Sequence, residues 1–262
     1  MAKRNRVTLK KFFAKGMLPS EDHFHDLIDS TLNTIDEGFD KTPEKGLEIS
    51  SRGLYERLIS LCRNDQPVWL IGYDGAQDTL LFKKKTAEGE TLTLSLAANG
   101  NVGVKQKDPH YDLDVGGAIR AAGRIGIPLS GRTSVPADGQ WHNITEELSG
   151  CQAFEVVAGV GKPKHGKYAI LHTVAMNTFN PKGFLFNFLN VKKRIPCHHA
   201  YYRSFIDKLN LRWHGKDRKY YLQLRSNSDY GDGIRIRYYL TKLWFDEDMS
   251  ESLQDLGRQE RT

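Results

Sequence analysis

The sequence predicts a mainly β protein with an N-terminal helix, followed by a β-rich stalk and a C-terminal antiparallel β-sandwich-like domain. Apolar residues follow a helical period near the N-terminus, and from about residue 54 they form short alternating or continuous runs instead. Turn-forming stretches separate the later runs, such as HGKD at 214–217 and NSDYGDG at 227–233. Short strands at such intervals are typical of an antiparallel sandwich.

The pattern predicts one helix over residues 19–37, which begins at the N-cap candidate Ser20 and ends before Gly38. Residues 40–53 are interpreted as a polar linker rather than a second helix. Because a lone helix of this length cannot bury its apolar stripe, another surface has to pack on that stripe. We expect self-association and anchoring through that stripe, the alternative being that it docks on the chain's own later domain. The stripe consists of Phe24, Leu27, Ile28, Leu32 and Ile35.

The middle of the chain carries strand patterns. In the clearest of them, Leu92, Leu94 and Leu96 alternate with threonine and serine, so we expect the three leucines on one face. Residues 98–101 (Ala-Asn-Gly-Asn) have the composition of a hairpin turn. The strand candidates of this region are 67–74, 79–86 and 91–96.

Residues 130–140, which are dense in Gly, Ser, Pro and Asp, are interpreted as a boundary loop before the last domain. Strand candidates beyond this loop cover 151–159, 167–176 and 183–190. Three further runs alternate well: Leu209, Leu211 and Trp213; Tyr220, Leu222 and Leu224; Ile234, Ile236, Tyr238 and Leu240.

The composition argues against several classes of protein. Hydrophobic residues make up 39% of the 262 residues, fewer than the roughly 45–50% of an average globular domain, which favours extended or oligomeric packing. Cys62, Cys151 and Cys197 are far apart and odd in number, so neither a disulfide framework nor a zinc knuckle is expected. The basic N-terminus lacks the apolar core of a signal peptide, and no run reaches the roughly 18 apolar residues of a membrane span. We expect synthesis in the cytoplasm and no membrane insertion; a larger particle would carry the chain to any site outside the cell.

The net charge of +6 invites a nucleic-acid interpretation. The basic runs at 3–6, 83–85 and 192–194 are short and scattered, however, so nucleic acid is not an expected partner. A solvated basic surface, facing an acidic neighbouring subunit or an anionic glycan, fits the charge better.

Some local patterns resemble chemical sites without meeting their requirements. Residues 126–133 have phosphate-loop spacing, but Arg132 stands where the lysine belongs and Pro128 interrupts the loop. His23 and His25 point to different sides of a helix and cannot share an ion within one chain.

Two further patterns are also incomplete. Gly159 and Gly161 lack the third glycine and the following helix of a dinucleotide fingerprint. Cys197, His198 and His199 have no partner motif at metal-ligand spacing. We therefore expect no metal and no cofactor.

An enzyme is the less favoured alternative. Serines and the acid–base residues of the C-terminal half could converge into a hydrolase triad or a carboxylate pair, but the sequence has neither a nucleophile elbow nor an HExxH motif. We expect no catalytic residues. The candidates for the alternative are His142, His172, Glu155 and Asp207.

A polar face lies opposite the apolar residues of the last strands. It combines planar hydrogen-bond donors with an aromatic ring, and can bind carboxylates or phosphates on a glycan or on a neighbouring subunit. A hydrated outer face is the alternative. The face consists of Arg212, Gln223, Arg225, Arg235, Arg237 and Tyr239.

Two segments, which cover under one fifth of the chain, carry a family resemblance. Residues 10–33 (KKFFAKGMLPSEDHFHDLIDSTLN) resemble the opening of tail-fibre-like proteins and of proteins of contractile injection systems. Residues 108–126 (DPHYDLDVGGAIRAAGRIG) are similar to the collar that precedes the C-terminal domains of phage and bacterial fibre proteins. The matching residues are Phe13, Gly16, Pro19, Phe24, Leu27, Ile28, Asp29, Ser30 and Asn33 in the first segment, and Pro109, Tyr111, Leu113, Asp114, Val115, Gly117 and Ile119 in the second.

The resemblance implies a homotrimer that assembles with baseplate or other subunits of a phage-tail-like contractile injection particle and performs no reaction. In a β-rich trimeric stalk, three glycine-rich copies would bury alternate side chains against each other. The alternatives are a receptor-binding adhesin for a cell-surface glycan and a particle-borne cell-wall hydrolase. The expected parts are a helical anchoring and trimerisation segment (1–45), the stalk and collar (46–137), the sandwich-like domain (138–250) and a flexible tail (251–262).

Overall fold

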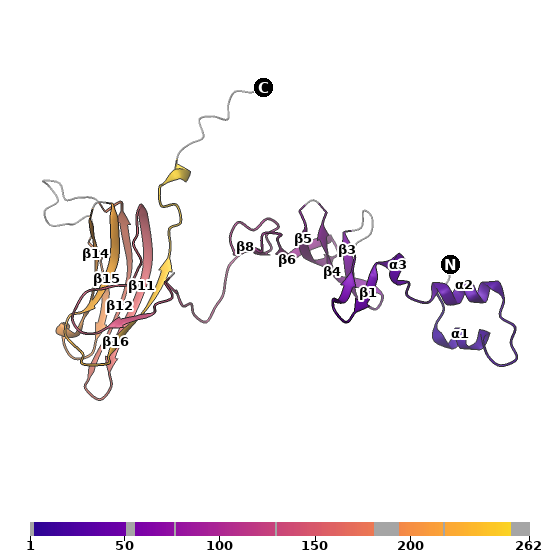
Figure 1. The fold of residues 1–262 in the computed structure, drawn as a ribbon, viewed down its shortest axis with the longest axis horizontal. Coiled ribbons are helices and arrows are strands. Elements are labelled where there is room, and N and C mark those ends of the chain that lie inside the picture. The colour runs from indigo at the N-terminus through magenta and orange to yellow at the C-terminus, as the bar shows by residue number, and fades with distance from the viewer. Residues whose placement is uncertain are drawn as a thin grey trace, which may run out of the picture. The chain divides into compact units, whose positions relative to one another are not determined.

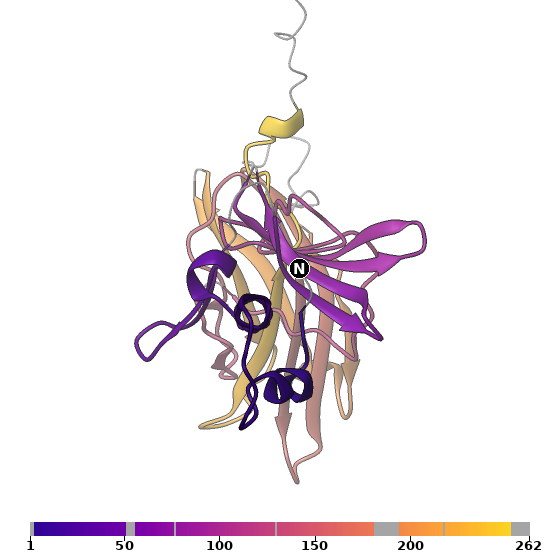
Figure 2. The ribbon, with the colours of Figure 1, turned by 90° about the vertical axis from the view of Figure 1, so that its right-hand side faces the viewer.

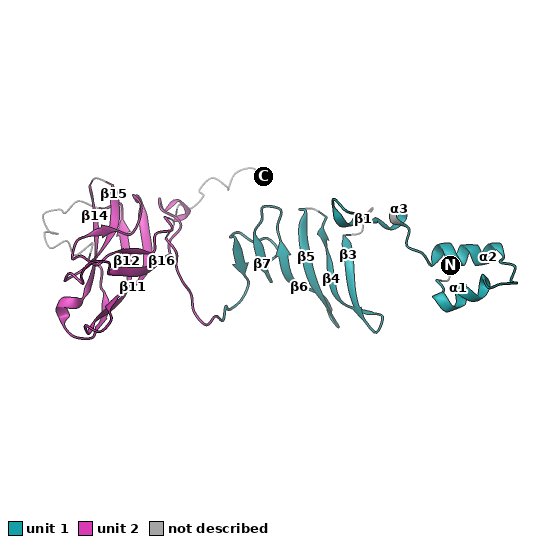
Figure 3. Ribbon diagram, turned by 60° about the horizontal axis from the view of Figure 1, so that its bottom comes forward, with its two compact units in different colours: residues 1–120 teal, residues 121–262 magenta. Residues whose placement is uncertain are grey.

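The computed structural model describes residues 3–50, 56–75, 77–128, 130–180, 194–216 and 218–252, with Thr34 and Ile35 described by their backbone alone. The chain forms two compact units, residues 1–120 and 121–262 (Figures 1 and 3). The protein is mainly β, with several antiparallel sheets, as predicted. None of the described helices is long and apolar enough to cross a membrane. The strand candidate 183–190 and residues 253–262 of the expected tail lie outside the described residues.

The predicted helix over 19–37 is interrupted. Helix α2 covers Glu21–Asp29, and a separate short helix α3 covers Thr34–Glu37. The side chains after α2 cause the break, because Ser30 Oγ donates to the Asp26 carbonyl at 2.6 Å and Thr31 Oγ1 donates to the Ile28 carbonyl at 2.8 Å. Such bonds to the last carbonyls of a helix compete with its continuation.

A first helix that the sequence analysis missed, α1 (Arg6–Phe12), packs against α2. The Phe12 ring stacks on His23 with centroids 4.0 Å apart, and the Phe13 ring meets Phe24 edge-on at 5.3 Å. The expectation of a lone helix was therefore wrong, since α1 is one partner of its stripe.

The predicted polar linker 40–53 was also wrong in part. Residues after α3 form a hairpin of β1 (Phe39–Thr42) and β2 (Gly46–Ile49). Gly38 has a positive φ of 64°, a conformation that ends α3. Its carbonyl accepts a hydrogen bond from the Ser50 N–H at 2.7 Å, so the same residue also begins the hairpin.

A six-stranded sheet of consecutive strands completes the first unit (Figure 3). Neighbouring strands pair antiparallel except β7 and β8, which are parallel. The connection between these two strands, 105–112, therefore has to cross the sheet. The strands are β3 (Arg57–Arg63), β4 (Gln66–Asp74), β5 (Thr79–Thr86), β6 (Gly89–Leu96), β7 (Val102–Val104) and β8 (Leu113–Val115).

The expectation that Leu92, Leu94 and Leu96 share one face was wrong for Leu92. The register between β5 and β6 shifts, so that Leu94 pairs with Phe82 whereas Leu92 pairs with Lys83. Because Phe82 and Lys83 are adjacent in β5 and point to opposite faces, the shift places Leu92 on the face opposite to Leu94.

The second unit consists of two antiparallel sheets, in the orders β13-β12-β11-β16-β9 and β10-β15-β14. Its longest strands, β11 and β12, pair along their whole length and form a long hairpin (Figure 2). The elements are β9 (Ser134–Pro136), β10 (His142–Asn143), β11 (Cys151–Lys162), β12 (Lys167–Thr178), β13 (His198–Tyr201), the 3-10 helix η2 (Phe205–Asp207), β14 (Leu209–Lys216), β15 (Lys219–Ser226), β16 (Arg235–Lys242) and the 3-10 helix η3 (Ser250–Ser252).

Both sheets of the second unit supply its core, as expected for a sandwich. The predicted alternation holds in the last strands, where Leu222 and Leu224 of one sheet and Ile236 of the other are completely buried. The Tyr220 hydroxyl, also buried, donates to the Gly150 carbonyl at 2.7 Å. The polar tip of this large side chain is thereby satisfied inside the core.

The boundary loop expected over 130–140 contains a strand instead. β9 pairs with β16, with Val135 opposite Ile236, and Val135 is 3% exposed. The valine belongs to the core of the second unit, although it precedes the boundary expected between 137 and 138. Composition had favoured a loop because Gly, Ser, Pro and Asp surround this short apolar segment.

Candidate binding surfaces

One face of the six-stranded sheet, called the open face below, carries apolar side chains without a cover. Paired residues in neighbouring strands point to the same side of a sheet, so the register identifies its members. Among the described residues, none of the apolar side chains of this face is buried, and Leu61 and Leu113 are 52% and 59% exposed. The members are Ile59, Leu61, Trp69, Ile71, Tyr73, Leu80, Phe82, Leu94, Leu96, Val102, Val104, Leu113 and Val115.

The opposite face, called the closed side below, is covered in part by the crossing connection 105–112. Ser95 is completely buried on that face and its Oγ donates to the Gln106 carbonyl at 2.6 Å. Lys107 Nζ reaches Asp74 Oδ2 at 2.7 Å. The chain thus covers part of one side of this sheet itself, whereas the more apolar open face has no cover among the described residues.

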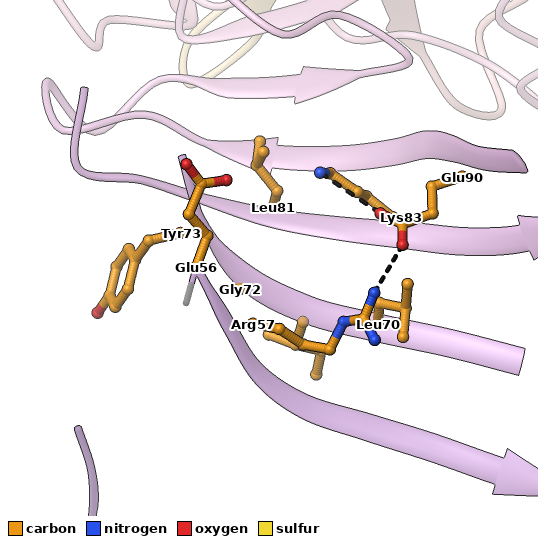
Figure 4. A pocket seen from close by; sticks show the side chains of 9 residues that line it. Glu56, Arg57, Leu70, Gly72, Tyr73, Leu81, Lys83 and Glu90 are labelled. Atoms are coloured by element: carbon orange, nitrogen blue, oxygen red, sulfur yellow. Dashed lines mark hydrogen bonds and ion pairs between the residues drawn. The ribbon is translucent and has the colours of Figure 1, made fainter. Parts of the chain in front are cut away.

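A pocket of about 550 Å³ lies on the closed side, beside the buried Leu70 and Leu81 (Figure 4). Its charged side chains neutralise one another, because Glu90 accepts from Arg57 at 2.7 Å and lies 3.7 Å from Lys83 Nζ. These ion pairs match the charges of the pocket within the protein itself.

The predicted stripe on the helices is only partly covered. Phe24, Ile28 and Leu32 are 49%, 63% and 56% exposed, even with α1 in place, and Leu27 is half-buried. The Ile35 side chain lies outside the described residues. An apolar patch therefore persists on the helical pair.

In the second unit a cleft of about 540 Å³, called the arginine cleft below, lies at the edge where β9 and β16 approach β10 and β15. Gln223 points outward from β15, and Arg235 enters from β16. The lining residues are Arg132, Ser134, Val135, Pro136, Trp141, His142, Asn143, Gln223 and Arg235.

Hydrogen bonds hold the polar wall of the cleft in place. Arg212 Nε donates to Gln223 Oε1 at 2.8 Å, and Gln223 Nε2 donates to Asn143 Oδ1 at 2.8 Å. Arg235 donates to Ser134 through Nε and Nη2, both at 2.9 Å. The predicted residues Arg212, Gln223 and Arg235 are thus fixed in orientation by their neighbours.

Trp141 organises two of the arginines. Its ring lies 4.2 Å from the guanidinium carbon of Arg212 and 4.5 Å from that of Arg225. Guanidinium groups bind well to the face of an indole ring. Burial and the nearby charge of Arg225 lower the pKa of Arg212.

Negative charge is scarce around the cleft. Within the described ranges, no carboxylate forms an ion pair with Arg132, Arg212, Arg225 or Arg235. Asp138 binds His142 Nε2 at 2.8 Å instead. Burial raises the pKa of that carboxyl, but the hydrogen bonds from His142 and the Gln140 N–H outweigh burial and lower its pKa overall.

Four members of the predicted face do not line the cleft. Arg212 and Arg225 lie against the Trp141 ring beside it, and Arg237 and Tyr239 point away from the buried Ile236 and Tyr238 of their strand. Sequence reasoning also missed Trp141 and Asn143. β10, to which Asn143 belongs, has only two residues and leaves no period to detect.

The candidates for an enzyme do not form a nucleophile–base pair. Glu155 Oε1 binds His172 Nε2 at 3.0 Å and its Oε2 binds Arg124. Asp207 is buried and accepts from Ser228 Oγ at 3.2 Å. Among the residues that the structure describes, no serine, threonine or cysteine side chain is hydrogen-bonded to His142 or His172.

The two glycine-containing patterns of the sequence analysis lie next to or inside strands. β9 follows the phosphate-loop-like segment 126–133 where a helix would be needed, and Gly159 and Gly161 lie inside β11. No cluster of potential metal ligands occurs among the described side chains, which include His198 and His199 at the start of β13. No family model matches the chain, and no curated protein is similar to it at a significant level.

Proposed function

We propose that the chain is a homotrimeric structural component of a phage-tail-like contractile injection particle, either a short fibre or a baseplate-peripheral protein. The open face of the six-stranded sheet is the observation that carries the proposal. Its two central rows consist of apolar side chains and cross the sheet from β3 or β4 to β8. Exposed apolar surfaces of this extent mark protein–protein contacts.

Other copies of the same chain are the proposed cover. The central rows contain no charged side chain, so three copies meet there without repulsion between like charges. Every copy of the chain carries this face, so a matching partner is present wherever the protein is synthesised. The resemblance of residues 108–126 to a fibre collar supports the same arrangement, because these residues include β8 at the end of both rows.

The helical pair is the proposed anchor to the particle. Its remaining exposed stripe, with Ile28 at 63% and Leu32 at 56%, lies in the segment that resembles the opening of fibre-like proteins. Co-production of the chain with the other particle genes tests this role. Ile28→Glu with Leu32→Glu should leave the trimer intact but remove the protein from purified particles.

Leu18→Glu is the matched control, since Leu18 is 94% exposed and lies outside the stripe. The control should be incorporated normally. Incorporation of the double variant at the wild-type level would refute the anchoring role. A receptor-binding adhesin is the second candidate, and the arginine cleft is the observation that favours it.

A further inference from the structure

Two cationic side chains line the arginine cleft, Arg132 and Arg235, and neither forms an ion pair with a carboxylate among the described residues. Arg212 and Arg225 lie against the ring of Trp141, which also lines the cleft. The guanidinium groups of these two arginines add positive charge beside the cleft.

We infer that this cleft binds a carboxylate-bearing sugar of an acidic glycan. The planar fork of a guanidinium matches the two oxygens of a carboxylate. Two hydrogen bonds to Ser134 hold the guanidinium of Arg235 in place before a ligand arrives. Such preorganisation lowers the entropy lost on binding.

The neutral groups of the cleft suit the rest of a sugar. The amides of Asn143 and Gln223 each carry an NH₂ group with two donors, of which Gln223 uses one for Asn143. Hydroxyl groups pair well with such amides. The volume of about 540 Å³ lies within the roughly 300–1,000 Å³ of small-ligand sites.

The arrangement favours a sugar acid over nucleic acid. A strand of nucleic acid requires positive charge along an extended track. Here Arg132 and Arg235 line one cleft, and Arg212 and Arg225 lie beside it against Trp141, whereas Arg237 of the same strand as Arg235 does not line it. The cleft lies wholly within the second unit, so the inference does not rest on the proposed trimer.

The test uses the full chain on an array of carboxylated oligosaccharides, which carry galacturonate, glucuronate or sialic acid, beside their neutral parent sugars. Preferential binding to at least one carboxylated member, weakened by added salt, is the expected result. Arg132→Gln and Arg235→Gln should each reduce the affinity at least tenfold, since each removes a guanidinium group that lines the cleft and can form a charge-assisted hydrogen bond.

Arg237→Gln is the matched control, because it removes the same charge from the adjacent outward position of β16. It should retain wild-type affinity. Circular dichroism verifies that each variant is folded, as expected because Arg132 and Arg235 are both exposed. Equal binding of neutral and carboxylated sugars, or equal losses in all three variants, would overturn the inference. Tighter binding to single-stranded DNA than to any glycan would also overturn it. The same holds if no glycan binds and Arg235→Gln is lost from purified particles, a result that would indicate an acidic protein partner.

Discussion

Leu96→Glu combined with Leu113→Glu should convert the trimer into a folded monomer. Leu96 and Leu113 are 38% and 59% exposed on the open face. Their exposed areas together equal about one fully exposed leucine side chain. Covering that surface is worth about 2 kcal/mol per protomer, or about 6 kcal/mol per trimer. The association constant should therefore fall by about four powers of ten, before the repulsion between the new carboxylates is counted.

Sedimentation velocity at micromolar concentration measures the effect, and circular dichroism reports the fold of each variant. In a free chain both sites face water, so the substitutions should change the stability of the monomer by no more than about 0.5 kcal/mol each. Leu47→Glu is the control for Leu113→Glu, because Leu47 is 54% exposed on the separate β1–β2 hairpin. A double variant that sediments as the wild type would refute the assignment of the open face.

Three further predictions concern stability. Tyr220→Phe leaves the Gly150 carbonyl without its partner and should cost about 1 kcal/mol, seen as a melting temperature of the second unit lower by about 3 °C; an unchanged melting temperature would argue against that bond. Hydrogen bonding to His172 lowers the pKa of Glu155. Burial raises this pKa and the charge of Arg124 lowers it, so that the pKa is lowered overall. Stability from Glu155 is therefore present above the ordinary pKa of 4.5 and lost as pH falls through the lower folded value, so the melting-temperature gap between wild type and Glu155→Gln should narrow from pH 6 to pH 3. A Cβ on Gly103 would collide with the Gln106 carbonyl oxygen and Ser95 Oγ, so Gly103→Ala should speed proteolysis within 105–112, and an unchanged cleavage rate would contradict this packing.

Regular strands were predictable because their side chains alternate between core and solvent. Leu222, Leu224 and Ile236 are buried as their period indicated, since one face of each strand meets the opposite sheet. Interruptions were not predictable from periodicity. Ser30 and Thr31 end α2 through hydroxyl bonds to carbonyls, inside a stripe that continues past them.

The register shift beside Phe82 is a second example, because it depends on the partner strand and moves Leu92 to the other face without changing the pattern of β6. The candidate site shows the same limit. Arg212 and Gln223 could be assigned to one face because they lie in regular strands. Trp141 joins them from a loop 71 residues before Arg212, and only the three-dimensional fold brings the two together.

The mass of the purified full-length chain in solution tests the central claim most directly. Light scattering during size-exclusion chromatography, repeated from high to low micromolar concentration, should give three times the mass of one chain throughout. A stable monomer over that range would contradict the account, because it would leave the open face permanently in water.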